Sequence, residues 1–76
     1  NPANDVLSIN FDAIESSVFT AELFDVTGKL VKTVTLNSQK GNNSHLLNIK
    51  DVNAGTYMLK IAGNESSMTR QLMIIR

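Results

Sequence analysis

The chain has 76 residues, no cysteine and a formal net charge of zero, with seven basic and seven acidic residues. This length allows one domain with a small core, and the absence of cysteine excludes disulfides and thiolate chemistry. The charges are scattered, which does not match the basic surface of a nucleic-acid-binding protein. The longest apolar runs, such as residues 72–75, are far shorter than a membrane span, so no membrane insertion is expected.

The first half of the chain shows the alternation that is typical of β-strands. Residues 1–5 are rich in the turn formers Asn, Pro and Asp. Residues 6–11 and 18–25 then alternate apolar with polar side chains, as half-buried strands do. Residues 12–17 between them predict a loop with a short edge segment. The predicted inward faces carry Leu7, Ile9 and Phe11 in the first strand, and Phe19, Ala21 and Leu23 in the second.

A hairpin is predicted where the second strand ends. Asp25 can open a type I turn, and Gly28 can take the left-handed position after it, which closes a hairpin with a bulge. The strand that follows, over residues 29–36, is rich in β-branched Val and Thr. Such residues favour a pleated surface over a helix.

The rest of the chain predicts a long loop, two further strands and the segment that joins them. Residues 37–44 are polar and are predicted to form the loop, and residues 45–49 a short strand with Leu47 and Ile49 facing inward. After a turn at 63–66, the final strand is predicted over residues 67–75. Its two faces are both apolar: Met68, Leu72 and Ile74 on one, Met73 and Ile75 on the other.

Residues 51–61 join a polar corner to a strand. Gly55 can adopt a positive φ, and Tyr57 opens the strand with a ring whose hydroxyl needs a partner when buried. This order resembles the tyrosine corner of immunoglobulin-like domains, in which the hydroxyl binds main chain slightly upstream. An ordinary turn before an ordinary strand is the alternative. With turns every ~8–12 residues and no helical periodicity, the sequence predicts an all-β, immunoglobulin-like antiparallel β-sandwich of about seven strands.

Catalytic chemistry has few candidate residues. His45 is the only histidine, and Ser44, His45 and Asp51 are the one set from which a Ser-His-Asp triad could be drawn. Neighbouring residues in a strand point to opposite faces, so Ser44 and His45 should diverge. We therefore predict no enzyme activity, no catalytic residue and no cofactor.

Metal and carbohydrate sites are also weakly supported. Zinc requires several His or Cys ligands, which this chain lacks. Four aspartates near loops could offer oxygen ligands to calcium, but no D-x-D-x-D run gathers them, so we expect turn or cap roles and no metal site. These are Asp5, Asp12, Asp25 and Asp51. Carbohydrate binding usually requires an exposed aromatic platform, and Phe24 is the one aromatic residue that alternation places opposite the core face.

Five short motifs follow one another at characteristic spacing along the chain. They occupy residues 1–5, 7–9, 23–31, 52–61 and 70–76. In this order they resemble the type A C-terminal sorting domain of the type IX (Por) secretion system of Bacteroidota. The resemblance covers essentially the whole chain.

The resemblance implies a function that the residues alone do not show. Such domains are immunoglobulin-like sandwiches that end secreted precursors and direct an N-terminal passenger through the type IX translocon across the outer membrane. A sortase-like peptidase at the cell surface then typically removes them. Residues 1–76 would be a single sorting domain from a larger precursor, cleaved upstream of Asn1. The protein would pass through the periplasm to the cell surface or the extracellular space.

The resemblance also assigns signature residues. They are Pro2 and Asp5 in the opening motif, Gly28 in the hairpin, Gly55 and Tyr57 in the corner, and Arg70 and Arg76 in the final motif. The family often has Lys in the final motif, where Arg keeps the charge but changes the hydrogen-bonding geometry. An immunoglobulin-like structural or carbohydrate-binding accessory domain of an extracellular enzyme or adhesin remains the alternative.

The final strand suggests how a partner would recognise the domain. Apolar residues on both faces indicate either full burial or a surface kept for a partner, and an exposed edge is a template for strand addition. We hypothesise that the translocon reads this end of the domain. A strand buried on both faces with its edge already paired would contradict the hypothesis. A strand-exchanged dimer of the isolated domain is a further expectation.

Overall fold

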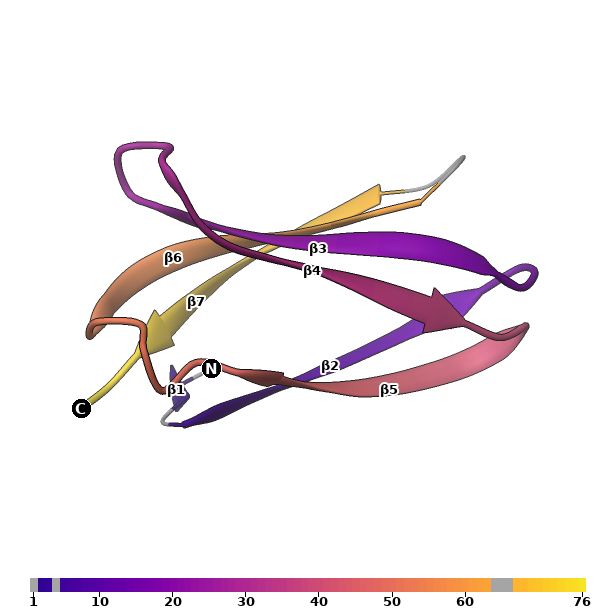
Figure 1. Cartoon of the computed structure of the whole chain (residues 1–76), viewed down its shortest axis with the longest axis horizontal. Coiled ribbons are helices and arrows are strands. Elements are labelled where there is room, and N and C mark those ends of the chain that lie inside the picture. The colour runs from indigo at the N-terminus through magenta and orange to yellow at the C-terminus, as the bar shows by residue number, and fades with distance from the viewer. Residues whose placement is uncertain (1, 4, 64–66) are drawn as a thin grey trace.

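Strands supply the regular structure of this chain, as the alternating pattern predicts. The computed structural model describes residues 2–3, 5–63 and 67–76, and it is a β-sandwich of a five-stranded and a two-stranded sheet (Figure 1). The strands are β1 (Pro2–Ala3), β2 (Val6–Ala13), β3 (Ser17–Asp25), β4 (Leu30–Ser38), β5 (Gly41–Asn48), β6 (Gly55–Ala62) and β7 (Ser67–Ile74). Over these described residues, no helix has the length and apolarity needed to cross a membrane.

The strand order is that of an immunoglobulin-like sandwich. The larger sheet has the order β1-β7-β6-β3-β4, and the smaller one pairs β2 with β5. Strands β7, β6 and β3 correspond to G, F and C of an immunoglobulin domain, β4 to C′, and the β2–β5 pair to B and E. All pairings among β2 to β7 are antiparallel. The two-residue β1 adds a parallel pairing to the outer edge of β7.

The core lies between the two sheets and confirms the predicted inward faces. Leu23, Ile49 and Ile74 are its most completely buried large side chains. The rings of Phe11 and Phe19 meet across the sandwich with centroids 5.0 Å apart. Burying a side chain of this size contributes roughly 1.5–3 kcal/mol, so a small core must be filled efficiently.

The hairpin between β3 and β4 forms as predicted. The amide of Gly28 donates to the Asp25 carbonyl at 3.0 Å, and Gly28 has φ +89°. One carboxylate oxygen of Asp25 accepts the Thr27 hydroxyl at 2.6 Å and the amides of Thr27 and Lys29 at 2.9 and 3.1 Å. The pKa of Asp25 is lowered, mainly by the hydrogen bond from the Thr27 hydroxyl and next by the one from the Lys29 amide.

The prediction of a long loop over residues 37–44 is wrong. Strand β4 continues to Ser38, and β5 begins at Gly41, so a short connection carries the chain from one sheet to the other. Pairing with β2 along the whole of β5 outweighs the low strand propensity of the Asn-rich segment. The buried Asn43 side chain holds the connection, since its amide nitrogen donates to the carbonyls of Gln39 and Gly41 and its oxygen accepts the Gln39 amide.

Two other predictions concern the bounds of a strand and of a turn. Strand β2 extends two residues further than predicted, to Ala13, because it stays paired with β5 up to Gly41. Residues 64–66 of the predicted turn at 63–66 lie outside the described residues.

Candidate recognition site at the corner end

The predicted tyrosine corner is present at the start of β6. The Tyr57 hydroxyl donates to the carbonyl of Asn53 at 2.7 Å, and the residue is only 7% exposed. Gly55 has φ +154°, which side-chain-bearing residues rarely adopt. A Cβ added there would meet the Tyr57 ring at 3.6 Å, an ordinary contact. Glycine is therefore required by the backbone conformation of the corner, not by lack of space.

Gly55→Val is expected to lower the thermal stability of the domain. A residue with a Cβ held at this φ costs about 1–3 kcal/mol, and β-branched Val is least able to adopt it. Thermal unfolding measures the effect, with the exposed neighbour substitution Ala54→Val as the control. An unchanged melting temperature for Gly55→Val would remove the argument for a required glycine conformation.

Tyr57→Phe is expected to destabilise the domain by roughly 1–3 kcal/mol, because the ring still fits but the Asn53 carbonyl loses its donor. Chemical denaturation of the two proteins measures the difference directly. A negligible difference would mean that the hydroxyl does not hold the corner.

The guanidinium of Arg76 binds the turn that precedes this corner. Its Nη2 donates to the carbonyls of Val52, at 2.6 Å, and of Ile49, and its Nε donates to Val52 at 3.2 Å. Its Nη1 lies 3.0 Å from a carboxylate oxygen of Asp5. One planar side chain therefore ties together the opening motif, the turn between β5 and β6, and the two residues that follow β7. Such a fork of donors suits Arg better than Lys.

The turn presents these carbonyls because the main chain holds it from both sides. The Ile49 amide donates to the carbonyl of Asp5 at 2.9 Å, and the Val52 amide donates to the carbonyl of Ile49 at 3.0 Å. The side chains of Ile49 and Val52 are buried in the core, which fixes the turn against the sandwich. These carbonyls are partly buried and need donors, which Arg76 supplies to both and the Val52 amide also supplies to Ile49.

An ion pair connects the turn to the edge of the larger sheet. The Lys32 ammonium of β4 lies 2.9 Å from a carboxylate oxygen of Asp51. The Lys32 hydrogen bond is the main cause of the lowered pKa of Asp51. The Asp51 side chain is well exposed, so the pair positions the turn more than it stabilises the fold.

The structure gathers most of the predicted signature residues at one end of the molecule. Four of them form what we call the corner end, together with residues 49–53: Asp5, Gly55, Tyr57 and Arg76. Gly28 belongs to the hairpin that projects at the same end, because Asp25 pairs with Tyr57 (Figure 1). The backbone of Pro2 pairs with Met73 nearby. Arg70 lies apart, in the middle of β7 opposite Leu59.

Strand β7 reaches the corner end with one buried and one exposed face. Leu72 and Ile74 are buried, whereas Met73 and Ile75 are 51% and 49% exposed. On its outer edge, β7 pairs with β1 only at Met73 and Ile74 among the described residues. A recognition role would be contradicted if β7 were buried on both faces and fully paired along its outer edge. Neither is the case among the described residues.

The residues considered for catalysis do not come together. Ser44 is exposed on one face of β5, and the His45 ring stacks on Phe11 from the other, with centroids 5.9 Å apart. The Nε2 atom of His45 is buried and has no hydrogen-bond partner among the described residues. Asp51 is occupied by Lys32.

The residues considered for calcium and carbohydrate binding are also dispersed. The aspartates have separate partners: Asp5 binds Arg76, Asp12 binds Asn42, Asp25 binds its own turn, and Asp51 binds Lys32. Within the described part of the chain, no three His, Cys, Asp or Glu side chains form a metal-binding group. Phe24 is partly buried and pairs in register with Met58 and Leu30, so it does not stand free as an aromatic platform.

The comparison with known families agrees with this geometry. A family model described as a secretion system C-terminal sorting domain matches residues 1–75. Searches of curated proteins and of solved structures returned no significant match. The family match includes the opening motif, the hairpin, the corner and β7, which meet at or near the corner end. The chain therefore belongs to the family of C-terminal sorting domains of type IX secretion.

Proposed function

We propose that the domain sorts its passenger by presenting the corner end and the exposed face of β7 to the type IX translocon. As a member of the sorting-domain family, it acts as a C-terminal signal that sends an attached N-terminal passenger to the cell surface or the extracellular space. The surface that the machinery reads, the route through the periplasm and the later cleavage belong to the proposal.

The contacts of Arg76 carry the proposal. They hold the residues after β7 against the turn at 49–52 and against Asp5, so segments far apart in sequence form one surface. Met73 and Ile75 stand exposed beside it. Exposed apolar side chains next to a rigid polar cluster are typical of a protein-binding surface.

The signature residues take different parts in this proposal. Gly55 and Tyr57 shape the corner, and Asp5 and Arg76 hold the chain ends against it. Gly28 forms the hairpin at the same end, Pro2 pairs with the outer edge of β7, and Arg70 lies within β7. We infer that the domain acts by binding alone, without catalysis, metal or cofactor. A sortase-like peptidase at the surface would cleave upstream of Asn1.

A transport assay tests the proposed function. Residues 1–76 are fused to a periplasm-directed fluorescent protein in a host with type IX secretion, beside a fusion that lacks residues 68–76. We expect export of the complete fusion and retention of the truncated one. Retention of both would contradict a sorting role and favour an accessory domain, to be tested next for glycan binding.

A surface substitution separates recognition from folding, since the truncation also removes most of β7. Met73→Glu places a charge on the exposed face, so it should leave the unfolding transition nearly unchanged and reduce export at least several-fold. The matched control is Val18→Glu, which is similarly exposed at the far end of β3. Equal export of both variants would exclude the face of β7 at Met73 from recognition.

A further inference from the structure

The sandwich is open along one side, between β2 and β7. Strand β2 pairs with β5 on one edge only, and among the described residues its other edge has no partner strand. Strand β7 pairs with β6 along its length, but on its outer edge only with the two residues of β1. Two strands, one in each sheet, therefore present free main-chain groups to the same opening. Free edges of this kind are what an added strand binds.

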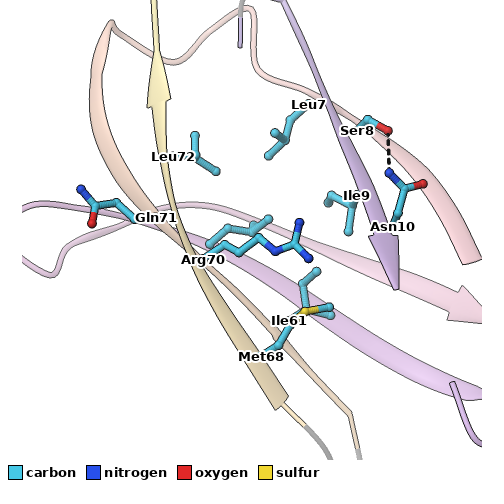
Figure 2. A pocket seen from close by; sticks show the side chains of 10 residues that line it. Leu7, Ser8, Ile9, Asn10, Ile61, Met68, Arg70, Gln71 and Leu72 are labelled. Atoms are coloured by element: carbon cyan, nitrogen blue, oxygen red, sulfur yellow. Dashed lines mark hydrogen bonds between the residues drawn. The ribbon is translucent and has the colours of Figure 1, made fainter. Parts of the chain in front are cut away.

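A shallow groove runs along this opening. Leu7 and Ile9 of β2 and Leu72 of β7 line a hollow of about 50 Å³, and the Arg70 side chain extends across it toward β2 (Figure 2). The groove continues past Met68 into a second hollow of about 240 Å³, beside Phe11. Arg70 has no ion pair with any residue that the structure describes. An apolar floor with an unpaired guanidinium suits an extended main chain, whose carbonyls accept hydrogen bonds from Arg.

The pairing of β1 shows from which direction the chain arrives. It is parallel to β7, with Pro2 beside Met73 and Ala3 beside Ile74, so each residue lies beside the one 71 positions later. A segment that extended β1 backwards in this direction would run along β7 from the side of Gln71, along the length of the groove. In the same register, the five residues directly before Asn1 would lie beside residues 71 to 67. At ~3.3 Å per residue, five residues span roughly 17 Å.

The outer edge of β2 borders the same groove, and the immunoglobulin fold normally has a strand at this edge. In immunoglobulin domains, strand A lies beside B at the edge of the sheet that contains B and E. Here β2 takes the place of B, and no described strand lies on its outer edge. A segment that continues β1 parallel to β7 runs antiparallel to β2, as strand A does to B, because β2 and β7 run in opposite directions across the sandwich (Figure 1).

We propose that the segment joining the passenger to Asn1 continues β1 as an extended strand in the groove between β2 and β7. This inference rests on the proposed function, which places a passenger before the domain. The register of β1 favours this occupant over a strand of the translocon or of a second copy, because the segment is covalently continuous with a pairing already formed. The connection between passenger and domain is then part of the folded sandwich, and the domain's outermost strand is supplied by the precursor.

Disulfide trapping in the passenger-bearing precursor tests the register. The domain has no cysteine, so introduced thiols are its only ones, and any passenger cysteines are replaced by serine. Gln71→Cys is combined with cysteine at the first residue before Asn1, and Thr69→Cys with cysteine at the third. Directly opposite residues on paired strands meet the Cα separation that a disulfide needs. Both substituted positions in β7 are exposed, so folding should be retained.

The controls are the mismatched combinations, and Thr35→Cys on β4 at the opposite edge of the sheet. We expect the matched pairs to cross-link at least tenfold more than the mismatched and Thr35 pairs. Equal cross-linking of all pairs, or none above the Thr35 control, would overturn the proposal. So would trapping of Gln71→Cys by a translocon component or a second copy.

Export of the same precursors is measured in parallel, because it answers a separate question. Normal export without register-specific cross-linking refutes the added strand and leaves the proposed function intact. Register-specific cross-linking supports the added strand even where export fails, and that failure counts against the proposed function alone.

Discussion

Gly63→Ala is expected to lower the melting temperature of the domain by about 5–20 °C. A Cβ at this position would lie 2.5 Å from Cε2 of the Phe19 ring, with Cδ2 and Cζ at 2.8 and 2.9 Å. The ring is buried and packed against Phe11, so it cannot move aside without disturbing the core. Overpacking of this kind costs about 1–3 kcal/mol, and each kcal/mol shifts the melting temperature of such a small domain by roughly 4–8 °C.

Two comparisons make the Gly63 experiment specific. Gly28→Asn is the matched control, since nothing lies within 4 Å of a Cβ there and Asn tolerates the left-handed conformation, so we expect a small change. Combining Gly63→Ala with Phe19→Leu should recover part of the loss, because a smaller side chain leaves room for the new methyl group. A Gly63→Ala protein that melts like the parent would show that the Phe19 ring can shift freely.

Arg76→Ala is expected to cost about 2–3 kcal/mol of stability and to abolish export. The substitution removes both Arg76 donors from the Val52 carbonyl and one donor from that of Ile49, and hydrogen bonds from charged groups are the costlier ones to lose. It also frees the residues after β7 from the corner end, on which the proposed recognition depends. Chemical denaturation and the export assay measure the two effects separately.

Graded substitutions separate the charge of Arg76 from its shape. Arg76→Lys keeps the charge but cannot reach two carbonyls and Asp5 with one planar fork, so an intermediate loss is expected. Asp5→Asn removes only an exposed ion pair and should cost well under ~1 kcal/mol. Full stability with lost export in Arg76→Ala would mean that the translocon contacts the guanidinium itself. Full stability with full export would contradict both roles.

Under the proposed function, the corner end also explains why the signature is spread over distant motifs. Residues 71 positions apart, Asp5 and Arg76, meet there through one ion pair. The corner supplies main-chain carbonyls that the buried side chains of Ile49 and Val52 hold in place. No single motif forms this surface alone. A partner that binds the corner end would therefore bind only a domain whose whole sandwich has folded.

The sequence by itself determined the features that depend on local chemistry. Alternation identified the inward faces of β2 and β3, because a strand with one buried face must repeat with a period of two. Asp25 and Gly28 identified the hairpin through their turn preferences, and Gly55 with Tyr57 identified the corner. The order of these motifs was enough to indicate the sorting-domain family.

Only the tertiary structure decided the features that depend on segments meeting across the sandwich. The Asn-rich residues 41–44 became strand because β2 offers them a full antiparallel partner and Asn43 bonds the connection, which outweighs their low propensity. A Cβ added at Gly63 would clash with the Phe19 ring, and this depends on where that ring packs. Arg76 was recognisable as a basic final residue, but its acceptors were not. Besides the Asp5 carboxylate, they are main-chain carbonyls 24 and 27 residues away, and such groups carry no side-chain signal until the core positions them.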